Sequence, residues 1–465
     1  MKLSLSQFLQ SPHKAFAGVA IVFGLLYLLV MPPFQVPDEN MHFWRSYQVS
    51  EGHLVPEIQG RAVGGMIPLS LGKVVEIWGY LPFKPDVDLK WSSHQESFSI
   101  PLERQVQVFA GFPNTAVYSP VPYVPQAIGI QFGKLLNLAP IVLSYLGRFS
   151  NMMVAIVLTF LALKIVPFYK WIFFLLSLTP MAISQRSSLS ADALTNAIAF
   201  LLSAIVLNLT FNPEKEKVEF RDAVILGVLS SLLSLCKLSY CVLPLICFLI
   251  PQRKFEDRKS YWLVCSIICL SSVVFCAAWT WTTKDISANF PYPLPTIAPK
   301  AQLQYLLSHP FRIPSIAWNQ FNRIDEYAEQ FIGVLGWLDT PIHGSVRLSY
   351  IWVLLIAALI SSEPEIFMLG GQRLKIFLVV AVTVFMIHAP LYFGWTAVGR
   401  AKVDGLQGRY FIPTSPLFFL LFYNHKFKLE ACRKNISLFI FCYVLFSSTN
   451  ALGTLLERYY HFGIS

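Results

Sequence analysis

Long apolar runs separated by short polar segments recur along this chain of 465 residues. A helix needs about 20 mostly apolar residues to cross a bilayer, and many of the runs approach that length. The pattern predicts about 11 crossings, at 15–31, 141–163, 168–184, 191–211, 223–236, 239–250, 261–282, 346–361, 375–395, 410–423 and 436–456. The sequence therefore predicts an all-α, polytopic membrane protein.

Two regions do not fit the simple pattern. Prolines and Lys134 interrupt the apolar stretch 119–137, so we interpret it as an interfacial or re-entrant helix. The region 223–250 is long for one helix and short for two, with Lys237 near its middle. A charge at the bilayer centre costs about 2.5–3.5 kcal/mol on insertion scales, so two short spans with Lys237 at the turn are favoured.

The charges in the loops predict the orientation of the chain. Loops rich in Lys and Arg usually face the cytoplasm. With 119–137 at the interface and 223–250 split into two spans, the basic loops lie inside, at 164–170, 213–222, 251–259, 362–373 and 425–435. The outer side then receives two long loops, 33–118 and 283–345. A single span at each ambiguous region would instead put Lys215, Lys217 and Arg221 outside.

This topology divides the chain into three parts. Residues 1–282 form a membrane module that includes the first outer region, 33–137. Residues 283–345 form the second long outer loop, and residues 346–465 form the C-terminal membrane helices.

Composition agrees with the membrane class. Charged residues make up 13% of the chain, whereas soluble domains contain about 25%. The net charge of +10 does not indicate nucleic-acid binding, because the basic residues lie in short loops between apolar runs. Most of the cysteines lie within or beside apolar runs, so neither a disulfide framework nor a metal site is expected there.

The segment just after the first apolar run has the most distinctive chemistry. Asp38 and Glu39 follow Pro37, which suits the first turn of a helix. In that helix Asp38, His42 and Arg45 would lie close to one face. A carboxylate at the membrane surface suggests chemistry on a lipid-linked substrate. The alternative is that Asp38 only caps a surface helix.

The predicted topology brings polar residues from distant parts of the chain to the same membrane face. They are Asp38, Glu39, His42, Arg45, Gln185, Arg186, Asp192, Lys237, Asp339, His343, Gln407 and Arg409. Charges within or beside membrane spans are often functional. A carboxylate could deprotonate an acceptor hydroxyl, and cations could stabilise charge on a phosphate leaving group. Surface solvation, caps or interhelical pairing are the alternative roles.

Eight short motifs in these regions resemble a known superfamily. They begin at Pro32 (PPFQVPDENMHF), Gly64 (GGMIP), Tyr118 (YSPVPY), Arg148 (RFSN), Ser190 (SAD), Lys237 (KLSY), Gly336 (GWLD) and Gly405 (GLQGRY). In this order the set resembles the GT-C superfamily of membrane glycosyltransferases, and in particular a bacterial family of predicted integral membrane proteins with that architecture.

The resemblance implies a GT-C-like fold and a polyprenyl-phosphate-linked sugar as donor. The acceptor would be a lipid-linked glycan or cell-envelope polymer on the outer face of the bacterial inner membrane. Asp38, Glu39 and Asp192 match the catalytic acidic positions, with Asp38 as the expected general base of an inverting displacement. Lys237 and Arg409 match phosphate contacts. The expected substrate-binding set also contains His42, Arg45, Asp339 and Gln407.

The Asp-x-Asp metal motif of the superfamily is absent, so no metal ligand is assigned and the need for a divalent cation stays open. A transporter or flippase of lipid-linked sugars is an alternative function, as is an inactive assembly subunit. Transporters often contain internal repeats and binding charges at the midplane. This chain has no clear repeat, and its charges gather at one face, which favours an enzyme.

Overall fold

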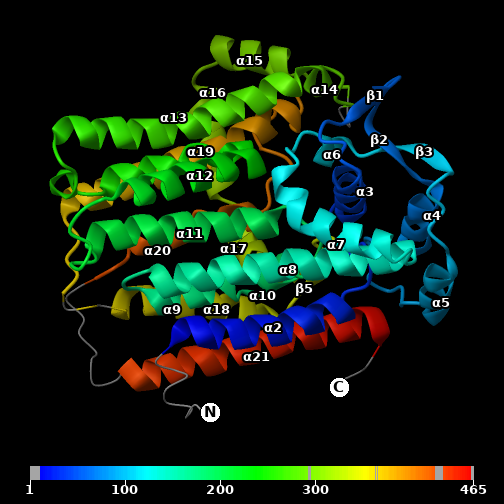
Figure 1. Cartoon of the computed structure of the whole chain (residues 1–465), viewed down its shortest axis with the longest axis horizontal. Coiled ribbons are helices and arrows are strands. Elements are labelled where there is room, and N and C mark those ends of the chain that lie inside the picture. The colour runs from blue at the N-terminus through cyan, green and yellow to red at the C-terminus, as the bar shows by residue number, and fades with distance from the viewer. Residues whose placement is uncertain (1–10, 292–294, 362, 364, 425–432, 462–465) are drawn as a thin grey trace.

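The computed structural model describes residues 11–291, 295–361, 363, 365–424 and 433–461. It is mostly helical, with few strands. Within these residues, six helices are long and apolar enough to cross a membrane. They are α2 (Pro12–Val30), α8 (Pro140–Ile165), α11 (Asp192–Phe211), α13 (Arg258–Thr282), α19 (Gly370–Gly394) and α21 (Arg433–Tyr460). In Figure 1 they run side by side as one bundle.

Shorter helices occupy the other predicted spans. They are α9 (Lys170–Ser177), α10 (Pro180–Arg186), α12 (Phe220–Cys236), η2 (Leu238–Tyr240), η3 (Leu243–Leu249), α18 (Gly344–Ile360), η5 (Gly408–Phe411) and α20 (Ser415–Leu420). A short 3-10 helix, η4 (Gln252–Lys254), precedes α13. Of the basic loop expected at 425–435, residues 425–432 lie outside the described residues.

The expected span 168–184 shows how a continuous apolar run becomes two helices. Pro180 cannot donate a backbone hydrogen bond, so it begins α10 rather than continuing α9. The Thr179 side chain caps the new helix by accepting a hydrogen bond from the Ala182 N–H at 3.1 Å. Because several expected spans are broken or short in this way, the count of about 11 crossings stays a prediction.

The ambiguous stretch 119–137 forms η1 (Val121–Tyr123) and α7 (Val124–Leu135). With 12 residues, α7 is too short to cross a bilayer. It packs closely on α8, because a Cβ at Gly129 would lie 2.3 Å from the Leu146 carbonyl oxygen. The glycine therefore sets the distance between the two helices.

The 33–118 region folds at one end of the bundle, on the right in Figure 1. Its elements are α3 (Glu39–Ser50), β1 (Glu57–Gln59), β2 (Ala62–Pro68), α4 (Leu69–Trp78), α5 (Trp91–Ser99), β3 (Gln107–Gly111) and α6 (Pro113–Ala116). The strands form an antiparallel sheet in the order β1-β2-β3, in which Gly64 lies opposite Gly111. We call this end of the bundle the site end.

The 283–345 region contains α14 (Lys284–Ala288), α15 (Pro299–Ser308), α16 (Arg312–Phe321), α17 (Ile324–Gly333), β4 (Val334–Leu335) and β5 (Thr340–Pro341). The β4–β5 hairpin turns at Gly336 and Leu338, which both have positive φ angles.

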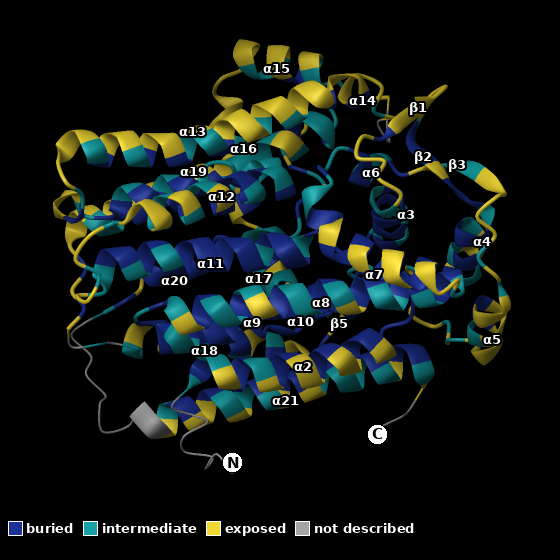
Figure 2. Ribbon diagram, in the orientation of Figure 1, coloured by how far each residue is buried: buried dark blue, intermediate teal, exposed yellow. Residues whose placement is uncertain are grey.

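Burial separates a central helix from peripheral ones (Figure 2). Most of α11 is buried on all sides, whereas α13 exposes most of its length. A helix that is apolar and buried all round belongs to the core of a bundle. Asp192, the first residue of α11, therefore lies at the centre of the site end.

Candidate functional site

Asp192 joins two cations from distant parts of the chain. Its Oδ1 lies 3.2 Å from Lys237 Nζ, and its Oδ2 lies 3.7 Å from Arg409 Nε. Lys237 follows the last residue of α12 in an extended conformation, which ends that helix. Arg409 lies in η5. A carboxylate in the first turn of α11 also interacts favourably with the helix dipole.

The surroundings of Lys237 keep it positively charged. Burial by itself would lower its pKa, but the Asp192 carboxylate and nearby tyrosine hydroxyls raise the pKa above its usual value. The Lys237 Nζ also lies 3.9 Å from the centre of the Tyr410 ring, a favourable cation–π arrangement. The pKa of Arg409 is raised as well, because Tyr410 and Asp192 outweigh the effect of burial.

Two buried polar atoms near these cations lack hydrogen bonds. Among the described residues, neither Arg409 Nε nor Gln407 Oε1 has a hydrogen-bond partner. Buried polar groups in proteins are rarely left unpaired. The Arg409 Nε–H can therefore donate a hydrogen bond to a ligand oxygen, and Gln407 Oε1 can accept one from a ligand hydroxyl.

Asp38 lies at the start of α3 with a left-handed backbone, φ 59°. Its side chain makes no capping hydrogen bond to the helix, so the capping role considered for it is absent. Instead Oδ1 accepts a hydrogen bond from Asn114 Nδ2 at 3.0 Å. The carboxylate is half-buried, and within the described chain it forms no ion pair within 4.0 Å.

His42 lies in the combined electrostatic field of these groups. Its Nδ1 is 2.9 Å from the Tyr123 hydroxyl. Burial lowers the pKa of His42 to about 4, against the opposing influence of Asp38 and Asp192. The imidazole is therefore neutral near pH 7. We call Asp38, His42, Asp192, Lys237 and Arg409 the charged cluster.

Glu39 has a different environment from its neighbour Asp38. It forms a two-pronged ion pair with Arg148, whose Nε and Nη2 lie 2.8 and 2.6 Å from the two carboxylate oxygens. The Leu189 N–H also donates to Glu39 at 3.0 Å. Both side chains of the pair are almost completely buried. Glu39 thus connects α3 to α8 and to the loop before α11.

Arg45 and Asp339 hold loops instead of joining the charged cluster. Arg45 Nη2 donates to the Leu54 carbonyl at 2.6 Å. Asp339 accepts hydrogen bonds from the backbone N–H groups of Phe83, at 2.9 Å, and Trp337, at 3.1 Å. The structure assigns both residues structural contacts, and their expected roles in substrate binding stay predictions.

Several residues of the site carried no assigned role in the sequence analysis. Arg148, Tyr123 and Tyr410 fall inside the short motifs, so the motifs were the available signal. Asn114 has no such signal, because only the folded chain brings it to Asp38.

Comparison with known families supplies the broad class of the protein. The model of a family described as a predicted membrane protein (DUF2142) matches residues 21–418. The chain belongs to this family. No curated protein and no solved structure matches the chain. It is a membrane protein with several apolar helices, and the family description assigns no activity.

The side chains of the charged cluster in this DUF2142 protein are better suited to bind an anion than a metal ion. Among the described residues, no group of three or more His, Cys, Asp or Glu side chains could hold a metal ion. In the charged cluster, Asp192 faces two cations instead of a second acidic side chain. Arg and Lys at such a position suit phosphate oxygens.

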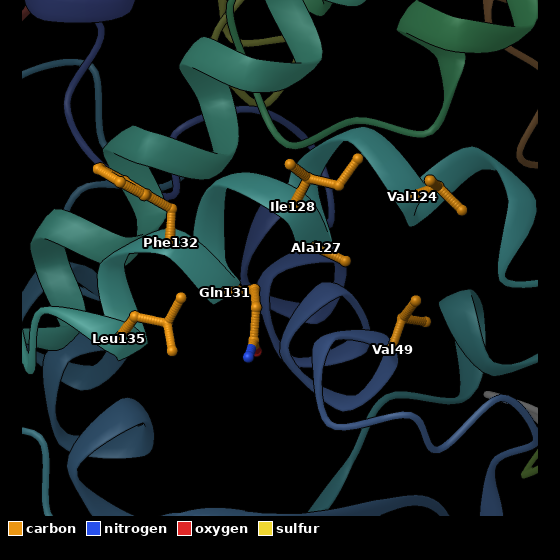
Figure 3. Close-up of a pocket in the computed structure, with 7 residues that line it drawn as sticks. All are labelled: Val49, Val124, Ala127, Ile128, Gln131, Phe132 and Leu135. Atoms are coloured by element: carbon orange, nitrogen blue, oxygen red, sulfur yellow. The ribbon is translucent and has the colours of Figure 1, made fainter.

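An apolar groove of about 440 Å³ lies between α3 and α7 (Figure 3). It is lined by Val49, Val124, Ala127, Ile128, Gln131, Phe132 and Leu135. Most of these residues belong to α7, which begins directly after Tyr123, the partner of His42. In this DUF2142 chain the groove therefore shares α3 with His42 and follows Tyr123 along α7.

Proposed function

We propose that this protein is a GT-C-like glycosyltransferase in the bacterial inner membrane, with its site on the extracytoplasmic face. It moves a sugar from a polyprenyl phosphate to a lipid-linked glycan or cell-envelope polymer. One observation carries the proposal. Asp38, which has no ion-pair partner among the described residues, acts on the pKa of His42 together with Arg409. Arg409 and Lys237 both pair with Asp192, so these groups meet at one end of a membrane bundle.

The proposed reaction is a direct displacement at the anomeric carbon. Asp38 takes the proton from the acceptor hydroxyl, and the hydroxyl oxygen forms a bond to the anomeric carbon. The bond from that carbon to the phosphate oxygen breaks, and its electron pair leaves with the polyprenyl phosphate. Lys237 and Arg409 stabilise the negative charge on the leaving phosphate.

Asp192 and Glu39 take supporting roles in this proposal. Asp192 already faces both cations, so it positions them for the phosphate and is less suited to act as the base. Both carboxylate oxygens of Glu39 accept hydrogen bonds from Arg148, and this pair anchors the start of α3 beside Asp38. The base is therefore assigned to Asp38 alone.

Lipid analysis of a strain that lacks the gene tests the function. Loss of the transferase should leave a polyprenyl-phosphate sugar accumulated in the outer leaflet. The wild-type gene and an Asp86→Asn control, which changes an exposed carboxylate of the same region, should clear it. The Asp38→Asn gene should not.

Three outcomes would contradict the proposal: no accumulated lipid, clearance by Asp38→Asn, or accumulation confined to the inner leaflet. The last outcome would assign the protein to flipping instead of transfer.

A further inference from the structure

Helices α15 and α16 lie on the flank of the bundle, with much of their length exposed (Figures 1 and 2). Large apolar side chains of this segment are among the exposed ones. The exposed set is Leu303, Leu307, Phe311, Ile313, Trp318 and Phe321. Phe311 is 92% exposed, and the Trp318 and Phe321 rings stack 5.8 Å apart. An exposed patch of this kind marks a contact with a membrane or with another protein.

Two amide side chains of the same helices, Gln302 and Asn319, bind the protein. Gln302 is buried, donates to the Tyr392 carbonyl at 3.2 Å and accepts from the Gly399 N–H at 2.9 Å. Asn319 Nδ2 donates to the Ala401 carbonyl at 3.0 Å. The helices therefore bind the protein through these amides while large apolar side chains stay exposed, as expected for an amphipathic helix whose apolar side faces lipid.

The contacts of Gln302 place this segment at the level of the membrane boundary. Tyr392 lies two residues before the end of α19 at Gly394, and α19 is one of the candidate membrane spans. α15 therefore lies level with the end of that span. It packs on the side of the bundle instead of extending beyond the bundle's end (Figure 1).

Charge distinguishes a lipid surface from a protein partner. Lys300 and Arg312 are exposed, and the sequence contains no Asp or Glu between Asp285 and Asp325. At the first residue of α14, Lys284 Nζ lies 4.7 Å from the centre of the Trp281 ring. Exposed aromatic side chains mixed with basic ones, and free of acidic ones, suit anionic head groups at a membrane interface.

We propose that residues 299–321, here called the amphipathic arm, lie in the bilayer interface at the site end and bind anionic lipid head groups through Lys300 and Arg312. The arm also holds the loop before Arg409, through the hydrogen bonds to Gly399 and Ala401. Binding of the arm to lipid therefore also holds residues 399–401 in place, at the start of the loop that leads to Arg409 of the charged cluster.

Nitroxide depth measurements on the purified full-length protein test the proposal. Leu307→Cys and Phe321→Cys, each in a variant without native cysteines, are labelled and reconstituted in nanodiscs. Phe83→Cys is the matched control, because Phe83 is an exposed aromatic residue of the 33–118 region. We expect the labels on the arm to collide more with oxygen than with a water-soluble nickel chelate, and the control label to show the reverse.

Lipid composition tests the charge part separately. Replacing zwitterionic lipid with phosphatidylglycerol should move the arm labels deeper, and Lys300→Gln with Arg312→Gln should remove that shift. Nickel accessibility at the arm equal to that at position 83, or spin–spin coupling between copies of the chain, would overturn the membrane assignment. A depth that does not respond to phosphatidylglycerol would overturn the anionic-lipid assignment. None of these readouts depends on sugar transfer.

Discussion

Two ion-paired groups lie at the site end, and their hydrogen bonding differs. Glu39 and Arg148 form a buried pair in which both carboxylate oxygens and several guanidinium N–H groups have partners at 2.6–3.0 Å. Asp192, Lys237 and Arg409 form a looser group. Its longest contact, from Asp192 Oδ2 to Arg409 Nε, is 3.7 Å, and among the described residues this Nε has no hydrogen-bond partner. The Lys237 and Asp192 side chains also retain some exposure.

The difference separates a structural ion pair from a candidate binding site. A saturated pair offers nothing to a ligand, and removing one partner leaves a buried charge. An unsaturated pair can exchange its internal contacts for ligand oxygens with little rearrangement. The charged cluster is therefore the place where a phosphate would bind, and the Glu39–Arg148 pair is part of its support. The predictions below test this contrast.

The largest effect on stability is expected at the saturated pair. Glu39→Gln leaves the Arg148 guanidinium buried without a counter-charge, which should cost about 3–5 kcal/mol. Thermal unfolding in detergent should show a strongly lowered midpoint. Glu57→Gln, at an exposed strand position, should melt like the wild type. A wild-type midpoint for Glu39→Gln would show that the pair does not support the fold.

The largest effect on rate is expected at Asp38. Removal of a general base costs on the order of 10²–10⁴ in rate, so Asp38→Asn should lose most of its turnover of purified donor lipid. Its melting temperature should stay near the wild-type value. Asn114→Ala should cause a smaller loss, because it removes only one hydrogen bond to the carboxylate. Near-normal turnover by Asp38→Asn would remove the base from the mechanism.

The cations should control donor affinity. A hydrogen bond to a charged group is worth about 1.5–3 kcal/mol, so Lys237→Ala and Arg409→Ala should each weaken binding of undecaprenyl phosphate by about 10- to 100-fold. Arg409→Lys should restore binding only in part, since lysine cannot hold phosphate with two parallel hydrogen bonds.

Equilibrium binding in detergent measures this effect, with Lys215→Ala as control. Lys215 pairs with Glu219 and Asp222 between α11 and α12, away from the charged cluster. Alanine variants that bind normally but melt early would make Lys237 and Arg409 structural, like Arg148.

The smallest expected effect is the response of stability to pH at His42. The folded-state pKa of His42 is about 4, below the unfolded value of about 6.5. Between these values the unfolded chain binds more protons, so stability falls as the pH decreases through this range. From pH 7 to 5 the loss should be about 1–2 kcal/mol, and it should be absent in His42→Gln.

Melting curves of both proteins at the two pH values measure the difference. His343→Gln, at an exposed histidine, should keep the wild-type response. The same pH response in His42→Gln and the wild type would show that His42 is not held neutral by burial.

The amino-acid sequence by itself determined the membrane class and the approximate positions of the long helices. Hydropathy is a sum over neighbouring residues, so it needs no knowledge of the fold. The sequence also identified Asp38, His42, Asp192, Lys237 and Arg409 as candidates, because charges beside apolar runs stand out locally.

Only the tertiary structure decided which of the candidates lie together. Asp38 and Glu39 are neighbours, yet a left-handed backbone at Asp38 leaves one carboxylate beside Asn114 and sends the other to Arg148. Arg45 and Asp339 have the same chemistry as the cluster residues, but loops at Leu54 and Phe83 use their hydrogen bonds. The physical reason is that these pairings join residues far apart in sequence, where a local pattern contains no information about distance.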